Sequence, residues 1–156
     1  MNSEDPFDQG LLIALRALKA SDKTEAEIRS RLAGRGIDAD AVERIIQHLK
    51  VKKFLSEERV VEETLRVAGE RRKEGKLKLL HRLEQRGVDP QLKEQAEIEL
   101  DPEIELAKAI SLLTKRYKPS DKVEKGALHL ARKGFEEETV REACERFFDR
   151  TDDHPL

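Results

Sequence analysis

The chain has 156 residues, enough for one ordinary domain or for several small stacked units. Its 31 Lys and Arg residues nearly balance its 33 Asp and Glu residues, and charged residues make up 41% of the chain. This balance excludes a uniformly basic binder of free DNA. The single cysteine excludes an internal disulfide, and no apolar run is long enough for a membrane span. We therefore expect a folded, cytoplasmic protein with no membrane partner.

Helix-forming residues at helical spacing dominate the chain. Leu, Ala, Glu, Lys and Arg are abundant, and the period-two alternation of strands is almost absent. Apolar residues recur at helical intervals, as in Leu12, Leu15 and Leu18, and Thr24–Glu27 forms a capping-box pattern. These features predict an all-α protein with nine helices, near residues 8–20, 24–35, 39–52, 56–74, 76–86, 90–99, 102–117, 120–133 and 137–149.

Three glycines occur in the same local context. Gly36, Gly87 and Gly134 each follow a basic residue and precede an apolar residue and then an acid. This pattern predicts a left-handed glycine after a helix, with the next residue packed on a leucine about one turn back. The glycines are 51 and 47 residues apart, which indicates a tandem repeat. We assign a structural role at the repeat junctions to Gly36, Gly87, Gly134, Ile37, Val88 and Phe135.

The repeat predicts three tandem three-helix repeats that form an elongated, curved array. A three-helix unit of this size cannot bury its apolar face alone, so stacking must supply a shared core. We expect a disordered N-terminus at residues 1–8, repeats at 9–55, 56–100 and 101–149, and a C-terminal tail at 150–156. The alternative is one compact nine-helix domain in which the repetition is fortuitous.

Residue types that carry catalysis or bind metals are scattered. None of the four histidines has a second histidine or a cysteine three or four residues away, and no Walker lysine loop, nucleophile elbow or dinucleotide fingerprint occurs. Cys144 lies in a stretch with apolar periodicity, which predicts a buried structural thiol. We therefore expect no enzymatic activity, no catalytic residue, no metal and no cofactor.

Charge is unevenly distributed along the chain. Residues 66–86 contain eight basic and three acidic side chains, whereas residues 89–106 contain seven acids and one lysine. The basic block is either a solvated helix face held by neighbouring glutamates, or a surface that contacts phosphates or an acidic protein. Because the block lacks aromatic residues, contact with a nucleic-acid backbone or a protein is favoured over base reading.

Several segments, in their order and spacing, resemble the RecX family of bacterial regulators of the RecA recombinase. Phe54–Arg59 lies where that family has an aromatic-Leu-Asp-Asp-x-Arg run, and Gly75 matches the glycine that opens the middle helix of its second repeat. The chain departs from the family at Val60, Val61, Thr64 and Lys76, and the segment between Arg59 and Gly75 is about one residue longer. Further matching segments are Ala14–Leu18, Thr24–Ile28, Arg31–Leu32, Arg35–Asp38 and Val42–Leu49.

The resemblance implies a non-enzymatic regulator of homologous recombination and DNA repair. Such a protein would bind the RecA filament on single-stranded DNA as a monomer, inhibit RecA ATP hydrolysis and strand exchange, and make at most weak direct contact with DNA. The alternatives are a helical protein-interaction scaffold and a weak, sequence-independent DNA-binding protein. We assign the contact surface to a basic patch of Arg59, Arg66, Arg71, Arg72, Lys73, Lys76, Lys78 and Arg82.

Overall fold

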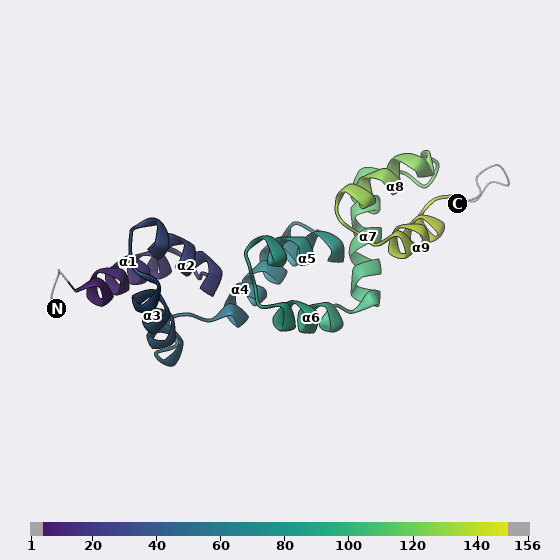
Figure 1. Ribbon diagram of the computed structural model, residues 1–156. Helices are drawn as coiled ribbons and strands as arrows, with labels where there is room; N and C mark the ends of the chain where they lie inside the picture. The colour runs from purple at the N-terminus through teal and green to yellow at the C-terminus, as the bar shows by residue number, and fades with distance from the viewer. Residues whose placement is uncertain (1–4, 150–156) are drawn as a thin grey trace. The chain divides into compact units, whose positions relative to one another are not determined.

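The structure is a computed structural model that describes residues 5–149, and every regular element in that range is helical (Figure 1). The all-α prediction is therefore confirmed. Residues 1–4 and the expected tail at 150–156 lie outside the described residues. In chain order the elements are α1 (Pro6–Ala20), α2 (Glu25–Gly34), α3 (Ala39–Val51), α4 (Glu57–Thr64), the π-helix η1 (Leu65–Arg71), α5 (Lys76–Gln85), α6 (Pro90–Glu99), α7 (Pro102–Arg116), α8 (Val123–Arg132) and α9 (Glu137–Phe147).

The helix α1 begins earlier than the sequence analysis expects. Asp5 accepts a hydrogen bond from the Phe7 N–H at 2.9 Å, and Pro6 occupies the first helical position. Disorder at residues 1–8 is therefore wrong for residues 6–8. Asp101 and Pro102 begin α7 in the same way, so one acid-proline signal begins both helices.

The three glycine turns have the predicted Schellman geometry. Gly36, Gly87 and Gly134 have φ angles of 81°, 75° and 93°. The amide of the apolar residue after each glycine donates to the carbonyl of a leucine five residues back: Ile37 to Leu32 at 3.1 Å, Val88 to Leu83 at 3.1 Å and Phe135 to Leu130 at 3.2 Å.

The helix predicted over residues 56–74 changes from an α-helix to a π-helix at Leu65. α4 ends at Thr64 and continues as η1, where the Arg72 N–H donates to the Val67 carbonyl at 3.1 Å. A π-helical turn accommodates one extra residue without breaking the helix. The predicted helix therefore continues to Arg71, but with a π-helical hydrogen-bond pattern from Leu65 onward.

The helices divide into two compact units. The first comprises residues 5–63 and 83–93, and the second comprises residues 64–82 and 94–149. This division passes through the expected second repeat, so the repeat boundaries at 9–55, 56–100 and 101–149 stay a prediction. No helix among residues 5–149 is long and apolar enough to cross a membrane.

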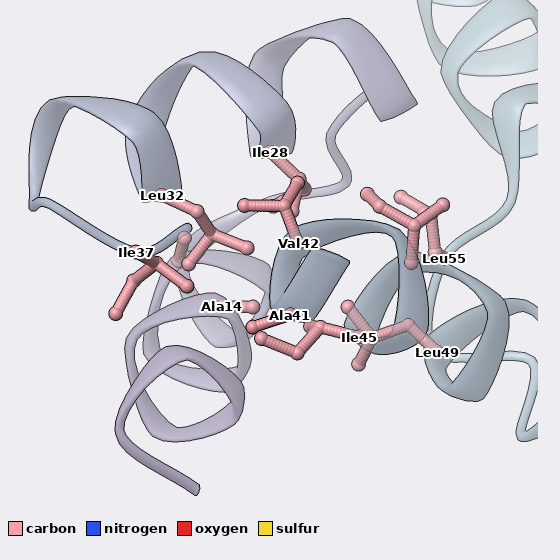
Figure 2. Close-up of a cluster of buried hydrophobic side chains, with 11 residues drawn as sticks. Ala14, Ile28, Leu32, Ile37, Ala41, Val42, Ile45, Leu49 and Leu55 are labelled. Carbon is pink, nitrogen blue, oxygen red and sulfur yellow. The ribbon is translucent and has the colours of Figure 1, made fainter. Parts of the chain in front are cut away.

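Each unit has its own aliphatic core. In the first unit, α1, α2 and α3 pack together and bury a cluster that Figure 2 shows, including Ala14, Ile28, Leu32, Ile45 and Leu49. In the second unit, α7 packs on α8 and α9 and buries Leu113, Leu130, Phe135, Cys144 and Phe148. Each fully buried large aliphatic side chain contributes roughly 1.5–3 kcal/mol.

Alanine substitution at two of the glycine turns separates backbone strain from packing. Gly36→Ala should destabilise the protein by about 1–2 kcal/mol, because a side chain at positive φ is strained and nothing lies within 4 Å of the added Cβ. Gly87→Ala should cost about 1–3 kcal/mol more, since its Cβ would lie 2.7 Å from the Ala26 Cβ. Thermal and urea unfolding measure both, and equal losses would contradict the packing contribution.

Candidate partner-binding surface

The eight residues of the basic patch do not share one environment. Arg59 lies in the first unit and the other seven lie in the second. Most of these side chains are exposed or half-buried, as expected of a contact surface. Their intramolecular partners differ, however, and those partners determine how much positive charge each residue leaves uncompensated.

Arg59 makes hydrogen bonds that hold the loop after α3 in place. Its Nε donates to Asp22 Oδ1 at 3.0 Å, and its Nη2 donates to the backbone carbonyls of Lys53 at 3.1 Å and Phe54 at 3.2 Å. The guanidinium is thus engaged by three acceptors within the first unit. Its charge is partly neutralised by Asp22, and its planar group fixes the path of the loop.

Lys78 and Arg82 converge on a buried carboxylate, Glu74. The Arg82 guanidinium donates to both Glu74 oxygens at 2.5 and 2.6 Å, and the Lys78 amine lies 3.9 Å from one of them. The Glu74 side chain is only 5% exposed. Hydrogen bonds from Arg82 hold the pKa of Glu74 below its ordinary value, although burial acts in the opposite direction. Arg82 is therefore neutralised by Glu74, while Lys78 shares the same carboxylate at a longer distance.

Lys76 is surrounded by acids. Its amine lies 3.4 Å from Glu136 and 3.8 Å from Glu97, and its backbone N–H donates to Glu105 Oε1 at 2.7 Å. Glu105 is in turn 2.6 Å from the buried Lys108 amine. The surroundings of Lys76 are therefore those of a structural ion-pair cluster.

The cationic turn, which we define as Arg71, Arg72 and Lys73, is different. Within residues 5–149 these three side chains make no hydrogen bond or ion pair. Arg71 and Arg72 are exposed, and Lys73 is half-buried. Lys73 has a left-handed backbone with a φ of 59°, and the Lys133 amine donates to the Arg72 carbonyl at 2.6 Å. The structure thus brings three cations without a hydrogen bond or ion pair together on a backbone of defined conformation, although the charge of Arg72 also acts on Glu74. Arg66 lies exposed on the preceding η1 helix.

The glycine turns dock against the start of an earlier helix. In the first unit the Thr24 hydroxyl at the start of α2 donates to the Arg86 carbonyl at 2.6 Å, just before Gly87. In the second unit the Gly75 N–H before α5 donates to the Lys133 carbonyl at 2.8 Å, just before Gly134. Two of the predicted junction glycines, Gly87 and Gly134, therefore lie where helices far apart in the sequence contact each other.

A buried carboxylate completes each of these contacts. Glu57 of α4 accepts hydrogen bonds from the backbone N–H groups of Glu25 and Asp89, both at 2.8 Å. Glu105 of α7 accepts from Lys76 N–H, as described above. Each carboxylate satisfies otherwise free amides at the start of a helix and complements its dipole.

A cleft in the first unit was not anticipated from the sequence. It has a volume of about 520 Å³ and its lining includes three cations, Lys23, Arg31 and Arg86, and one carboxylate, Glu27. Burial raises the pKa of Glu27, but hydrogen bonds from Arg86 and Thr24 outweigh it and hold that pKa below its ordinary value. The two sides of the cleft are about sixty residues apart in the sequence, so no local motif signals it.

The groups considered for chemistry stay apart in the structure. Among residues 5–149 no three His, Cys, Asp or Glu side chains are placed to hold a metal ion. Burial raises the pKa of the Cys144 thiol to about 11, which keeps it protonated at neutral pH. Burial, followed by the nearby charges of Arg116 and Lys133, lowers the pKa of His129.

Helices joined by recurring glycine turns, two of which dock on earlier helices, define an all-α helical protein. A family model described as the first three-helix domain of RecX matches residues 11–49. Regulatory protein RecX of Deinococcus radiodurans is 33% identical over 136 residues, which cover 85% of this chain and 65% of that protein. Regulatory protein RecX of Clostridium perfringens strain 13 is 30% identical over 132 residues, which cover 85% of this chain and 61% of that protein. This chain belongs to the RecX family.

Solved structures share the fold. The crystal structure of RecX from Lactobacillus salivarius matches with a TM-score of 0.81 and 22% identity, over 91% of this chain and 96% of that chain. A second crystal structure, of regulatory protein RecX, matches with a TM-score of 0.77 and 19% identity, over 92% and 75% of the two chains. The chain spans less than two thirds of the length of the Deinococcus and Clostridium relatives.

Removing the charge of Glu74 should destabilise the second unit. Glu74→Gln leaves Arg82 without its charged acceptor and should lower the free energy of unfolding by about 1–3 kcal/mol at pH 7. The folded pKa of Glu74 lies below its ordinary value of 4.5, so its contribution is present above that pH and is lost as the pH falls through the lowered pKa. The loss caused by the substitution should therefore shrink on acidification, as urea unfolding at several pH values will measure.

The matched control for Glu74 is Glu142→Gln. Glu142 also pairs with an arginine, Arg146, at 2.8 Å, but both side chains are about half exposed. Exposed pairs contribute little, so this change should cost less than about 0.5 kcal/mol. A similar loss in both variants would contradict the importance of burial at Glu74.

Proposed function

We propose that this protein is a non-enzymatic regulator that binds the RecA filament on single-stranded DNA and inhibits RecA ATP hydrolysis and strand exchange. In this proposal it acts in the cytoplasm as a monomer, without a cofactor, and touches DNA only weakly. Its membership of the RecX family and the name "regulatory protein" of its relatives support the proposal.

The cationic turn is the observation that locates the proposed contact with RecA. Its three side chains make no hydrogen bond or ion pair among the described residues, whereas Lys76, Lys78 and Arg82 all form ion pairs with carboxylates. Within the basic patch we therefore propose Arg71, Arg72 and Lys73 as the main contact residues.

Fixed backbone geometry favours this turn as a binding surface. Lys73 is held in a left-handed conformation, and the Arg72 carbonyl is hydrogen-bonded to Lys133. Less conformational freedom is lost when such a turn binds than when a flexible tail binds, so more of the electrostatic attraction contributes to affinity. The partner would present an acidic protein surface or phosphates, and weak contacts to several protomers of a filament would add up through multivalency.

Charge reversal tests both the function and its location. The wild-type protein should inhibit single-stranded-DNA-dependent ATP hydrolysis by RecA in a titration. The triple variant Arg71→Glu, Arg72→Glu, Lys73→Glu should need at least about tenfold more protein for the same inhibition, equivalent to about 1.4 kcal/mol of lost binding free energy. Circular dichroism and thermal unfolding should show that its helices are retained.

A second triple variant controls for net charge. Lys118→Glu, Lys122→Glu and Lys125→Glu reverse three exposed lysines in the same unit and should leave inhibition within about twofold of wild type. Unchanged inhibition by the Arg71–Lys73 variant would contradict the contact surface. Absence of any effect of the wild-type protein on RecA would contradict the function and favour the scaffold alternative.

A further inference from the structure

Phe54 is an exposed aromatic side chain within a lysine-rich segment. Its side chain is 50% exposed, and Val51 on the same segment is 76% exposed. All five phenylalanines lie in the described range, and the other four are buried or half-buried. The segment from residue 50 to residue 54 contains three lysines, so the exposed ring lies within a cationic stretch.

The backbone around Phe54 is fixed on both sides. Its N–H donates to the Leu49 carbonyl at 2.9 Å, and its own carbonyl accepts from Arg59 at 3.2 Å. Lys53 before it has a φ of 61°, which turns the chain sharply, and Leu55 after it is buried in the core. The ring therefore emerges from a well-defined position, and little backbone freedom would be lost on binding.

Two of the three lysines in this segment are unpaired within the described residues. Lys52 and Lys53 make no ion pair with any residue of the described range, while Lys50 lies 3.5 Å from Glu25. The nearby acids already have partners: Asp22 is bound by Arg59, and Glu57 accepts two backbone N–H groups. Glu58 accepts a hydrogen bond from the Ser56 hydroxyl.

We propose that Phe54, Lys52 and Lys53 form a stacking platform for an unpaired nucleotide of a single-stranded nucleic acid. The base would stack on the exposed ring, and the two ammonium groups would neutralise the flanking phosphates. Any base offers a π-face, so binding would be tolerant of sequence. A duplex would not use the ring, because its bases are stacked on one another. The inference goes beyond the proposed function, since the platform needs no RecA.

The same residues would fit an anionic membrane surface less well. One half-exposed ring and one valine offer little apolar area for insertion, and reversible anchoring needs a larger apolar face or a lipid chain. Base stacking requires only one flat ring flanked by cations. Binding to anionic vesicles is therefore the competing outcome of the test.

Binding of the full chain to oligonucleotides, without RecA, tests the platform. The probes are fluorescein-labelled oligothymidylate and oligouridylate of about 20 nucleotides, longer than one site, and a duplex of the same length, followed by anisotropy at low salt. Phe54→Ala should weaken binding to both single strands by about 5- to 150-fold, and Phe54→Tyr should retain affinity within about twofold. Lys52→Glu combined with Lys53→Glu should weaken binding and reduce its salt dependence.

Leu128→Ala is the matched control, because Leu128 is 52% exposed on α8 and its truncation removes similar apolar surface elsewhere. It should bind single strands as the wild type does, and all variants should unfold at a similar temperature. Any of three results would overturn the inference: no single-strand binding by the wild type, equal binding by Phe54→Ala, or an equal loss of duplex binding. Vesicles of phosphatidylserine and phosphatidylcholine that bind the wild type but not Phe54→Ala, without single-strand binding, would identify a membrane surface instead.

Discussion

The left-handed glycine turn is the constraint on which the packing between successive helical groups depends. At positive φ the chain reverses direction within one residue after a helix, and it exposes the carbonyl just before the glycine. The carbonyls of Arg86 and Lys133, before Gly87 and Gly134, are the ones that receive donors from the starts of α2 and α5. At Gly75 an added Cβ would lie 2.5 Å from the Phe135 nitrogen, so this approach of two backbones requires glycine on both sides.

The high fraction of charged residues follows partly from these contacts. A helix start that docks on another helix still carries free N–H groups, and buried donors need acceptors. Glu57 and Glu105 supply carboxylates at two such places, and Lys108 and Arg82 compensate the buried charges in the second unit. Part of the 41% charged composition therefore stabilises the interior instead of forming a surface for partners.

Features that depend on local sequence could be predicted, whereas ion pairs between residues brought together by folding could not. The glycine turns and most helix boundaries depend on signals within about five residues, so Gly36, Gly87 and Gly134 were predicted correctly. The ion pairs of Glu74 with Arg82 and Lys76 with Glu136 depend on how the chain folds back, and linear charge counting treats all four as surface residues. The cleft at Lys23 and Arg86 was missed for the same reason. The early start of α1 was missed although Asp5 and Pro6 carry a local signal.

Both non-glycine residues with positive φ in residues 5–149 are lysines, Lys53 and Lys73, and each ends a helix beside an exposed cationic segment. Glycine would adopt either conformation without the cost of roughly 1–2 kcal/mol that a side chain incurs there. Lysine adds a charge at a point where the chain turns and neighbouring groups fix the backbone, through Arg59 in one case and Lys133 in the other. Local strain at these two positions thus coincides with two places where cationic side chains make no ion pair among the described residues. Strained backbone positions often occur at binding sites, and no packing contact explains these two, so the strain is consistent with the binding role proposed for both lysines.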